Sequence, residues 1–325
     1  YVIIDAPGHV EFIRNMITGA SCAEAAILII DAEEGVREQT RRHAYMLSLL
    51  GIDQVVVVIN KMDRVNYSKD RYDMVSDDIV SFLAGIGVQP AGLIPISAIT
   101  GDNVADHSDN LAWYSGPTVL DMLDTLITAD EVAHTTFVMP VQDIYKIDDD
   151  RIIAGKIESG AVRKGQDVTI LPADTETKIR EIKKFNERPE SASQAENIGI
   201  VTQDPVFVDR GDIICSGKDQ IKTTQDLQAT VFWLDKKPIH VGDKIMLRIA
   251  TQEISAKITR IPRRINSSTL KVEEKNASKL ENLDVAEVCI TTKKPVVIKD
   301  EELIKGLSRF VLVQDENVCA GGLII

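Results

Sequence analysis

Residues 55–63, Val55-Val56-Val57-Val58-Ile59-Asn60-Lys61-Met62-Asp63, join an apolar run to a polar loop. Five β-branched residues in succession predict a strand that is buried on both faces, as in a parallel sheet covered by helices. The loop that follows is then expected at the carboxyl end of this strand. Open α/β sheets bind their ligands at that end.

Other segments of the first 134 residues repeat this alternation of strand and helix. Apolar runs that predict further strands of the same sheet lie at 2–4, 26–30 and 93–96. Helical periodicity lies between them at 37–50 and 68–84, and Ser68 is suited to cap the second helix. A third helix is predicted from Pro117, with an apolar face made by Val119, Leu120, Leu123 and Leu126.

The rest of the chain has a different period. After about Thr135 the helical pattern disappears, and short alternating runs separated by Gly, Asp and Asn continue to Ile325. Small closed barrels are expected, because closure removes exposed strand edges. The sequence therefore predicts three domains: an α/β domain over 1–134, a β-barrel over 135–222 and a second β-barrel over 223–325.

The composition of the chain fits this plan and disfavours two kinds of partner. Its 325 residues are 44% hydrophobic and 27% charged, as in folded globular domains. The longest apolar runs fall well short of the roughly 20 residues that cross a bilayer, so no membrane segment is expected. The net charge of −13, from 37 basic and 50 acidic residues, disfavours nucleic acid.

The cysteines and the first residues indicate the compartment. Four cysteines are scattered singly, so neither a disulfide framework nor a paired-cysteine zinc site is predicted. The first residues read as a strand, without a basic leader or a small-residue cleavage site. We expect a cytoplasmic protein.

The segment Asp5-Ala6-Pro7-Gly8-His9 follows the first apolar run and is expected at the same edge of the sheet. There, Asp5 can hold Mg²⁺ through water. The backbone N–H of Gly8 can approach a terminal phosphate, because no side chain intervenes. The alternative is a simple Pro-Gly turn after a strand.

The loop Asn60-Lys61-Met62-Asp63 matches a base-binding loop. The Asp63 carboxylate can accept from both the ring N–H and the exocyclic amine of guanine, whereas adenine would leave the charge unpaired. Ser97 and Ala98 follow the last run of the sheet, where their backbone N–H groups would reach the same base. The alternative is that Asn60 to Asp63 only cap the following turn.

These three segments, in this order and at this spacing, resemble the translation-factor GTPases. The resemblance extends to Arg14-Asn15-Met16-Ile17-Thr18-Gly19-Ala20 and to Gln39-Thr40-Arg41-Arg42-His43. It implies the fold of that class, a P-loop-type α/β GTPase domain followed by two β-barrels. It also implies binding of GTP with Mg²⁺, and it gives His9 the catalytic role of orienting the attacking water.

Within this class, the chain is most similar to the GTPase subunit of sulfate adenylyltransferase. The segments that carry this similarity are 39–43, 97–98 with 101–104, and 113–118. The similarity implies that a separate catalytic subunit is the partner. It also implies that GTP hydrolysis is coupled to the synthesis of adenylyl sulfate from ATP and sulfate. Whether an adenylylsulfate kinase domain follows Ile325 is left open.

One family motif is not found between Tyr1 and Ile325. The phosphate-binding sequence G-x-x-x-x-G-K-[ST] and the first switch are expected upstream of Tyr1, so the chain is interpreted as an N-terminally truncated GTPase. The stretch 211–219 has the wrong glycine spacing and is interpreted as a β turn. Without the phosphate loop, the isolated chain is expected to hydrolyse GTP negligibly.

Two other functions stay open. An elongation factor that carries aminoacyl-tRNA shares the same plan, although the acidic charge and the segment 113–118 argue against it. The densest basic cluster, Arg260, Arg263 and Arg264, is interpreted as a solvated face or a protein interface. The second alternative is a binding module without catalysis, which residual nucleotide affinity would distinguish.

Overall fold

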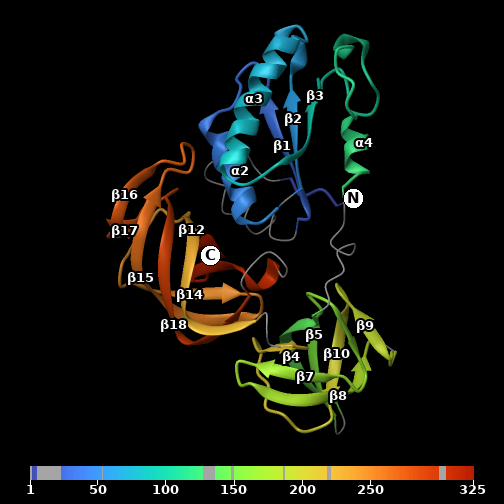
Figure 1. The fold of residues 1–325 in the computed structure, drawn as a ribbon, viewed down its shortest axis with the longest axis vertical. Helices are drawn as coiled ribbons and strands as arrows, with labels where there is room; N and C mark the ends of the chain where they lie inside the picture. The colour runs from blue at the N-terminus through green and yellow to red at the C-terminus, as the bar shows by residue number, and fades with distance from the viewer. Residues whose placement is uncertain are drawn as a thin grey trace. The chain divides into compact units, whose positions relative to one another are not determined.

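The computed structural model describes residues 2–5, 23–52, 54–126, 136–147, 150–185, 187–217, 221–299 and 305–325. The chain divides into two units, which are described one at a time (Figure 1). Unit 1 comprises Tyr1–Ala129 and Ile265–Glu273, and unit 2 comprises Asp130–Arg264 and Glu274–Ile325.

Unit 1 is built on a parallel sheet of β1 (Ala25–Asp31), β2 (Gln54–Asn60) and β3 (Pro90–Pro95), in that order. The register places Asp31 beside Asn60 and Ile59 beside Pro95. The carboxyl ends of all three strands therefore meet at one edge. Val55 to Ile59 are all buried, as their unbroken β-branched run predicts.

Helices cover the sheet. α2 (Glu38–Leu49) and α3 (Lys69–Gly85) connect successive strands and contact each other, and α3 is capped by the Ser68 side chain, as predicted. α4 (Val119–Leu123) lies against the other face, where Met122 joins the buried cluster of Val56, Val58, Ile94 and Ile96. Two short 3₁₀ turns complete the unit, η2 (Met62–Val65) and η3 (Asp109–Leu111).

The apolar face predicted for the third helix is partly wrong. The helix begins at Val119, because Thr118 forms a capping box with Asp121. Leu120 is 50% exposed, and Met122 is buried in its place. Val119, Met122 and Leu126 share the buried face, which is the i, i+3, i+7 spacing of one helix side.

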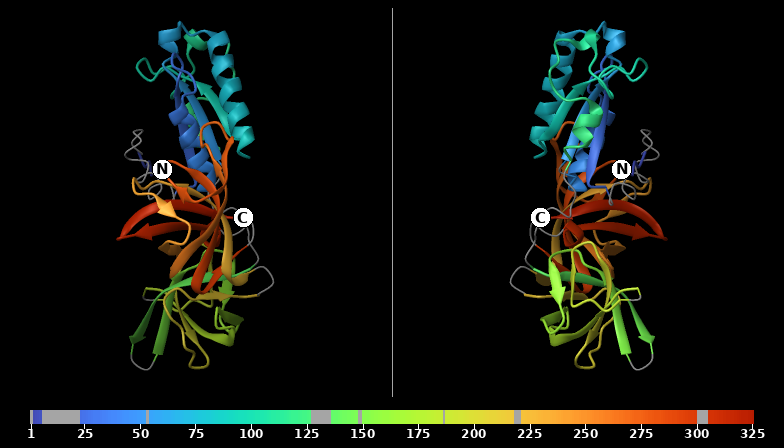
Figure 2. Two further views of the ribbon diagram at one scale, coloured as in Figure 1. Left: turned by 90° about the vertical axis from the view of Figure 1, so that its left-hand side faces the viewer. Right: turned by 90° about the vertical axis from the view of Figure 1, so that its right-hand side faces the viewer.

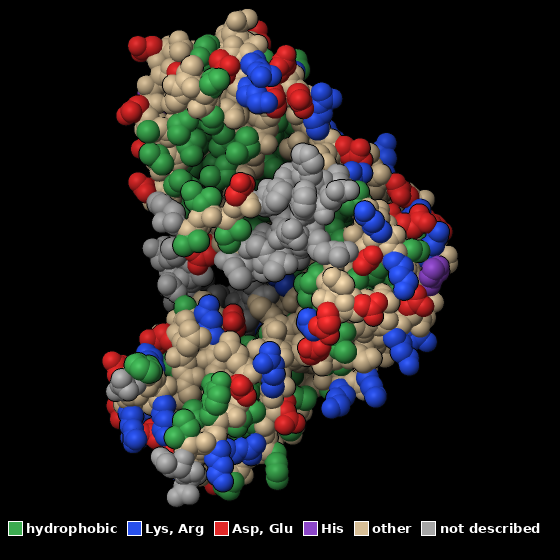
Figure 3. Space-filling model, turned by 180° about the vertical axis from the view of Figure 1, so that it is seen from behind, with side chains coloured by type: hydrophobic (Ala, Val, Ile, Leu, Met, Phe, Trp, Pro, Cys, Tyr) green, Lys and Arg blue, Asp and Glu red, His purple; other side chains and the backbone are tan. Residues whose placement is uncertain are grey.

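The first run of the sequence also departs from its prediction. Residues 2–5 are irregular, and Val2 and Ile3 are 93% and 85% exposed. A strand buried on both faces needs a hydrogen-bonded neighbour and a covering layer, and no described strand pairs with the outer edge of β1. Ile27 and Ile29 on β1 are exposed for the same reason, and Figure 3 shows apolar side chains gathered on this unit.

The first barrel of unit 2 is closed by six antiparallel strands (Figure 2). They are β4 (Val138–Ile147), β5 (Asp150–Lys156), β7 (Asp167–Leu171), β8 (Thr175–Lys183), β10 (Asn197–Thr202) and β11 (Ile213–Cys215). A separate pair is formed by β6 (Ala161–Arg163) and β9 (Ser191–Ser193). Aliphatic side chains and Phe137 fill the interior.

The second barrel of unit 2 closes through the pairing of β14 with β15. Its strands are β12 (Lys222–Trp233), β14 (Lys244–Ile249), β15 (Gln252–Ile265), β18 (Val285–Ile298), β19 (Arg309–Gln314) and β20 (Asn317–Ile324). The remaining elements are β13 (Ile239–His240), β16 (Val272–Ala277), β17 (Lys279–Leu280) and the 3₁₀ turn η5 (Lys305–Leu307). Trp233 and Phe310 lie in its core.

An α/β domain followed by two β-barrels is therefore confirmed. An apolar cluster that includes Val138 and Cys215 from the first barrel and Val297 and Leu307 from the second makes the barrels one unit. Among the described residues, no helix combines the length and apolarity that a bilayer span requires.

Candidate functional site

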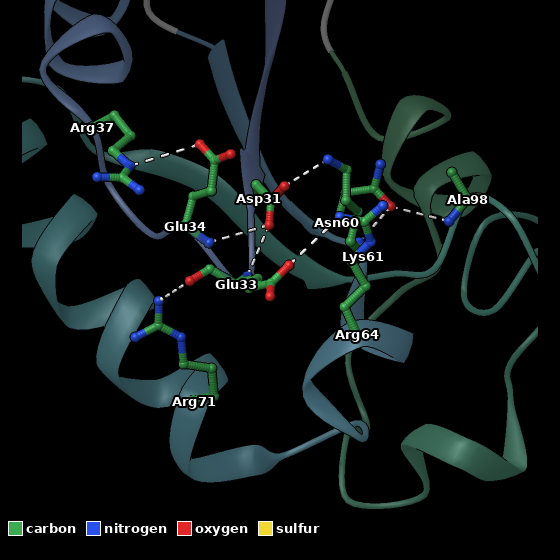
Figure 4. A network of polar contacts seen from close by, with 9 residues as sticks. All are labelled: Asp31, Glu33, Glu34, Arg37, Asn60, Lys61, Arg64, Arg71 and Ala98. Atoms are coloured by element: carbon green, nitrogen blue, oxygen red, sulfur yellow. Dashed lines mark hydrogen bonds and ion pairs between the residues drawn. The ribbon is translucent and has the colours of Figure 1, made fainter.

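Polar loops gather at the carboxyl edge of the sheet in unit 1. They follow β1, β2 and β3 and bring together Asp31, the segment 60–63 and the segment 97–98. Figure 4 shows Asp31, Asn60, Lys61 and Ala98 at this edge. The parallel register causes this meeting, because it ends neighbouring strands at the same level.

Asn60 ties two of these loops together. Its Oδ1 accepts hydrogen bonds from the backbone N–H of Lys61 at 2.7 Å and of Ala98 at 3.0 Å. The Met62 side chain is fully buried. The backbone N–H of Met62 donates to the Ile96 carbonyl at 3.1 Å. The loops after β2 and β3 are therefore one hydrogen-bonded structure.

Asp63 is oriented by Ser97. The Ser97 hydroxyl donates to Asp63 Oδ1 at 2.6 Å, and the Ser97 residue is fully buried. Asp63 itself is half-buried, and its second oxygen has no hydrogen-bond partner among the described residues. One carboxylate oxygen is thus fixed by the protein, and the other can accept from a ligand.

The backbone N–H groups of the third loop have intramolecular acceptors. The Ser97 N–H donates to the Asp102 carbonyl at 3.3 Å, and the Ala98 N–H donates to Asn60. The contact of these N–H groups with a base stays a prediction. Ser97 orients Asp63, and Ala98 anchors the side chain of Asn60.

Sequence reasoning missed Asp31, the last residue of β1. Its Oδ2 accepts from Lys61 Nζ at 2.6 Å, and its Oδ1 accepts from the N–H groups of Glu33 and Glu34. Burial raises the pKa of the Asp31 carboxyl, but the Lys61 ammonium and these N–H groups lower it further, so it lies below its ordinary value. The signal was an Asp directly after an apolar run, the same signal that identified Asn60.

Asp102 organises the base of the third loop. Its carboxylate accepts from the hydroxyls of Tyr67, Thr100 and Ser108 and from the Asn110 amide, and only 8% of the residue is exposed. Burial raises the pKa of Asp102, but these donors outweigh it and hold the pKa below its ordinary value. This carboxylate therefore stays charged and fixes the loop.

The segment 113–118 is bound to the same structure. Trp113 Nε1 donates to the Tyr67 carbonyl at 2.9 Å, and its ring lies 5.2 Å from that of Tyr72. Tyr67 adopts the left-handed conformation with φ 54°, which only a well-held residue of its size tolerates. The segment thus holds the loop after η2 in place.

Of the residues predicted in the segment 5–9, only Asp5 is described. Gly8 and His9 lie outside the described residues. Asp5 is described but is exposed and irregular. Across the described ranges, no group of three or more His, Cys, Asp or Glu residues could hold a metal ion. The water-mediated Mg²⁺ contact of Asp5 stays a prediction.

Comparison with known proteins gives the class. Residues 1–129 match the Elongation factor Tu GTP binding domain, and residues 226–325 match the GTP-eEF1A C-terminal domain-like family. Sulfate adenylyltransferase subunit 1 of Cellvibrio japonicus is 32% identical over the whole chain and 69% of its own length. The chain belongs to the translation-factor class of GTPases.

Two further relatives show the breadth of this class. Elongation factor 1-alpha of Methanopyrus kandleri is 35% identical over the whole chain and 81% of its own length. The solved structure of Sup35 complexed with GDP is similar with a TM-score of 0.57 and 27% identity, covering 93% of this chain and 78% of that one. The names of the sulfate adenylyltransferase subunit and of elongation factor 1-alpha describe different functions.

Replacement of Asp102 by Asn tests the anchoring of the third loop. The amide NH₂ is a donor and would face hydroxyls that now donate to the carboxylate. We therefore expect the free energy of unfolding of unit 1 to fall by about 2 kcal/mol at pH 7. The lowered pKa means that this contribution is present above the ordinary Asp pKa and is lost as pH falls through the folded value. The deficit of Asp102→Asn should therefore shrink in acid.

Urea unfolding followed by circular dichroism at 222 nm can measure this difference, because the described α-helices lie in unit 1. Asp106→Asn, an exposed carboxylate in the same loop, is the matched control and should leave stability unchanged. If the loss of unfolding free energy in Asp102→Asn stays constant as the pH is lowered, the charge of Asp102 is not what anchors the loop.

Proposed function

We propose that this chain binds guanine nucleotides at the carboxyl edge of the unit 1 sheet and is the GTP-hydrolysing subunit of a sulfate adenylyltransferase. In this role, GTP hydrolysis drives the formation of adenylyl sulfate from ATP and sulfate on a separate catalytic subunit in the cytoplasm. The observation that carries the guanine part is Asp63, with one oxygen fixed by the buried Ser97 and the other free to accept.

The chemistry of Asp63 favours guanine over adenine. A carboxylate accepts only, and guanine presents two adjacent donors, its ring N–H and its exocyclic amine. Adenine has no matching donors at these positions and would leave a half-buried charge unpaired, which costs more than a missing neutral hydrogen bond. Preorganisation by Ser97 supports the assignment, since no side-chain freedom is lost when the base binds.

Lys61 supplies a second feature of a base site. Its ammonium is tied to Asp31, so its aliphatic stem is fixed beside Asp63 and can flank a planar ring. Asn60 serves the site indirectly, by holding the Lys61 and Ala98 backbones.

The phosphate end of the site rests on the family alone. There, Gly8 would offer its N–H to the terminal phosphate and His9 would orient the attacking water, as catalytic residue. Mg²⁺ bound through water to Asp5 belongs to the same expectation. The described residues contribute no geometry to this part of the proposal.

The choice of partner is supported by charge and by the sulfate adenylyltransferase relatives. Of the basic cluster at 260–264, Arg263 is paired with Glu287, and Arg264 lies 3.4 Å from both Glu274 and Asp284. Arginines neutralised in this way release few counterions from nucleic acid. An elongation factor that binds tRNA stays the second candidate, because elongation factor 1-alpha relatives are as similar to the chain. A binding module without catalysis is the third.

Asp63→Asn should shift the preference of the complete gene product from guanine toward xanthine nucleotides. An amide can donate to the oxygen that xanthine carries at position 2, whereas guanine has an amine there. We expect GDP affinity to fall by about 10- to 100-fold and xanthosine diphosphate affinity to rise, measured by calorimetry. Asp77→Asn, an exposed carboxylate on α3, is the control. Unchanged affinities for both nucleotides would remove Asp63 from the base site.

The partner can be tested by mixing the complete gene product with GTP and either the catalytic subunit of sulfate adenylyltransferase or aminoacyl-tRNA. We expect GTP-dependent binding to the catalytic subunit and stimulation of adenylyl sulfate synthesis, measured as release of pyrophosphate. Tight GTP-dependent binding of tRNA without any stimulation would reject the sulfate assignment in favour of an elongation factor. Nucleotide binding with neither activity would favour the binding module.

A further inference from the structure

Asp31 is held on two sides at the carboxyl edge of the sheet. Oδ1 accepts from the N–H groups of Glu33 at 2.8 Å and Glu34 at 3.2 Å, and Oδ2 accepts from Lys61 Nζ at 2.6 Å. The Asp31 side chain is 16% exposed, whereas that of Lys61 is 44% exposed. The carboxylate is therefore the fixed partner of this ion pair, and Lys61 is the side chain whose position it determines.

The backbone of Lys61 needs such support. Lys61 adopts the left-handed conformation, with φ 66° and ψ 36°, which non-glycine residues rarely occupy. Its N–H is bound by Asn60 Oδ1, and its ammonium reaches back to the end of the neighbouring strand. Both ends of the residue are thus held at the edge where the proposed base site lies.

The turn that presents Asp31 is itself clamped by α3. Arg71 donates from Nε to the Ala32 carbonyl at 2.6 Å and from Nη2 to the Glu33 carbonyl at 2.8 Å. Gly35, with φ 74°, lets the chain turn there, and a Cβ at this position would lie 3.2 Å from Arg71 Nη2. One guanidinium therefore fixes the loop whose N–H groups fix Asp31.

The outer ion pairs of this network contribute less. Glu33 with Arg64 and Glu34 with Arg37 are separated by 3.5 Å and 3.6 Å, and all four side chains are more than half exposed. Solvent screens such pairs. Arg71 thus holds the 31–35 turn, the turn holds Asp31, and Asp31 holds Lys61.

We propose that Asp31 is a positioning residue of the guanine-nucleotide site, which fixes Lys61 so that its aliphatic stem flanks the base beside Asp63. This inference rests on the proposed function. Freezing a long, flexible side chain before binding removes an entropic cost from the binding step, which corresponds to about 3- to 10-fold in affinity. Because the stem contacts a ring face and reads no donor or acceptor, Asp31 contributes affinity without base discrimination.

Asp31→Asn in the complete gene product tests this proposal with two nucleotides, GDP and inosine diphosphate, which lacks the exocyclic amine that Asp63 would read. We expect both affinities to fall by the same factor of about 3 to 10, with their ratio unchanged. In a Lys61→Met background, adding Asp31→Asn should have no further effect, because Asp31 acts through Lys61. If Asp31→Asn fails to fold, Lys61→Met alone is a second variant that removes the ion pair.

The control is Asp78→Asn, which breaks the 2.7 Å ion pair between Arg41 on α2 and Asp78 on α3, away from the loops. It should leave both affinities unchanged. A changed ratio of GDP to inosine diphosphate affinity, or a full Asp31→Asn effect in the Lys61→Met background, would overturn the positioning role and indicate general distortion of the loop.

Asp63→Ala separates the failure of this inference from failure of the proposed function. If Asp63→Ala leaves GDP affinity unchanged, the base site itself is misassigned. If Asp63→Ala abolishes the preference for GDP over inosine diphosphate while Asp31→Asn leaves both affinities intact, only the positioning role is rejected.

Discussion

The in-register parallel pairing of β1, β2 and β3 is the constraint on which the candidate site depends. It places Asp31 beside Asn60, and Ile59 beside Pro95, so that the loops after the three strands begin at one level. The buried run from Val55 to Ile59 sets this level, because its side chains on both faces resist a shift along the strand. The polar edge is thus positioned by the apolar core beneath it.

Hydrogen bonds then convert this edge into a rigid surface. Asn60 joins the second loop to the third, Ser97 fixes Asp63, and Asp102 anchors the third loop to Tyr67. The side chains that make these bonds, from Asn60, Ser97, Asp63, Asp102 and Tyr67, are all at least half-buried, where an unsatisfied polar group would be costly. A rigid surface of this kind suits a ligand with fixed donors, such as a purine base.

The sequence predicted the parts of this arrangement that depend on local pattern. The strand at 55–59, the Ser68 cap and the polar loop at 60–63 follow from β-branched runs and capping residues that act within a few positions. The prediction for residues 2–4 was wrong, because burial on both faces depends on neighbours that periodicity does not reveal. Leu120 was assigned to the wrong side of its helix, since the side that is buried depends on packing against the sheet, which periodicity alone does not fix.

The finer roles in the site depend on pairings between residues far apart in sequence, which pattern reasoning cannot supply. Asp31 and Lys61 are separated by 30 positions, and Ser97 and Asp63 by 34. The roles of Gly8 at the terminal phosphate and of His9 at the attacking water stay predictions.

Competition between nucleotides tests the central claim, that this edge reads guanine, most directly. Labelled GDP would be bound to the complete gene product and displaced by unlabelled GDP or ADP. The geometry of Asp63 predicts that GDP competes at least about 100-fold better than ADP, since adenine leaves the carboxylate unpaired. Equal displacement by the two nucleotides would contradict the assignment of this edge as a guanine site.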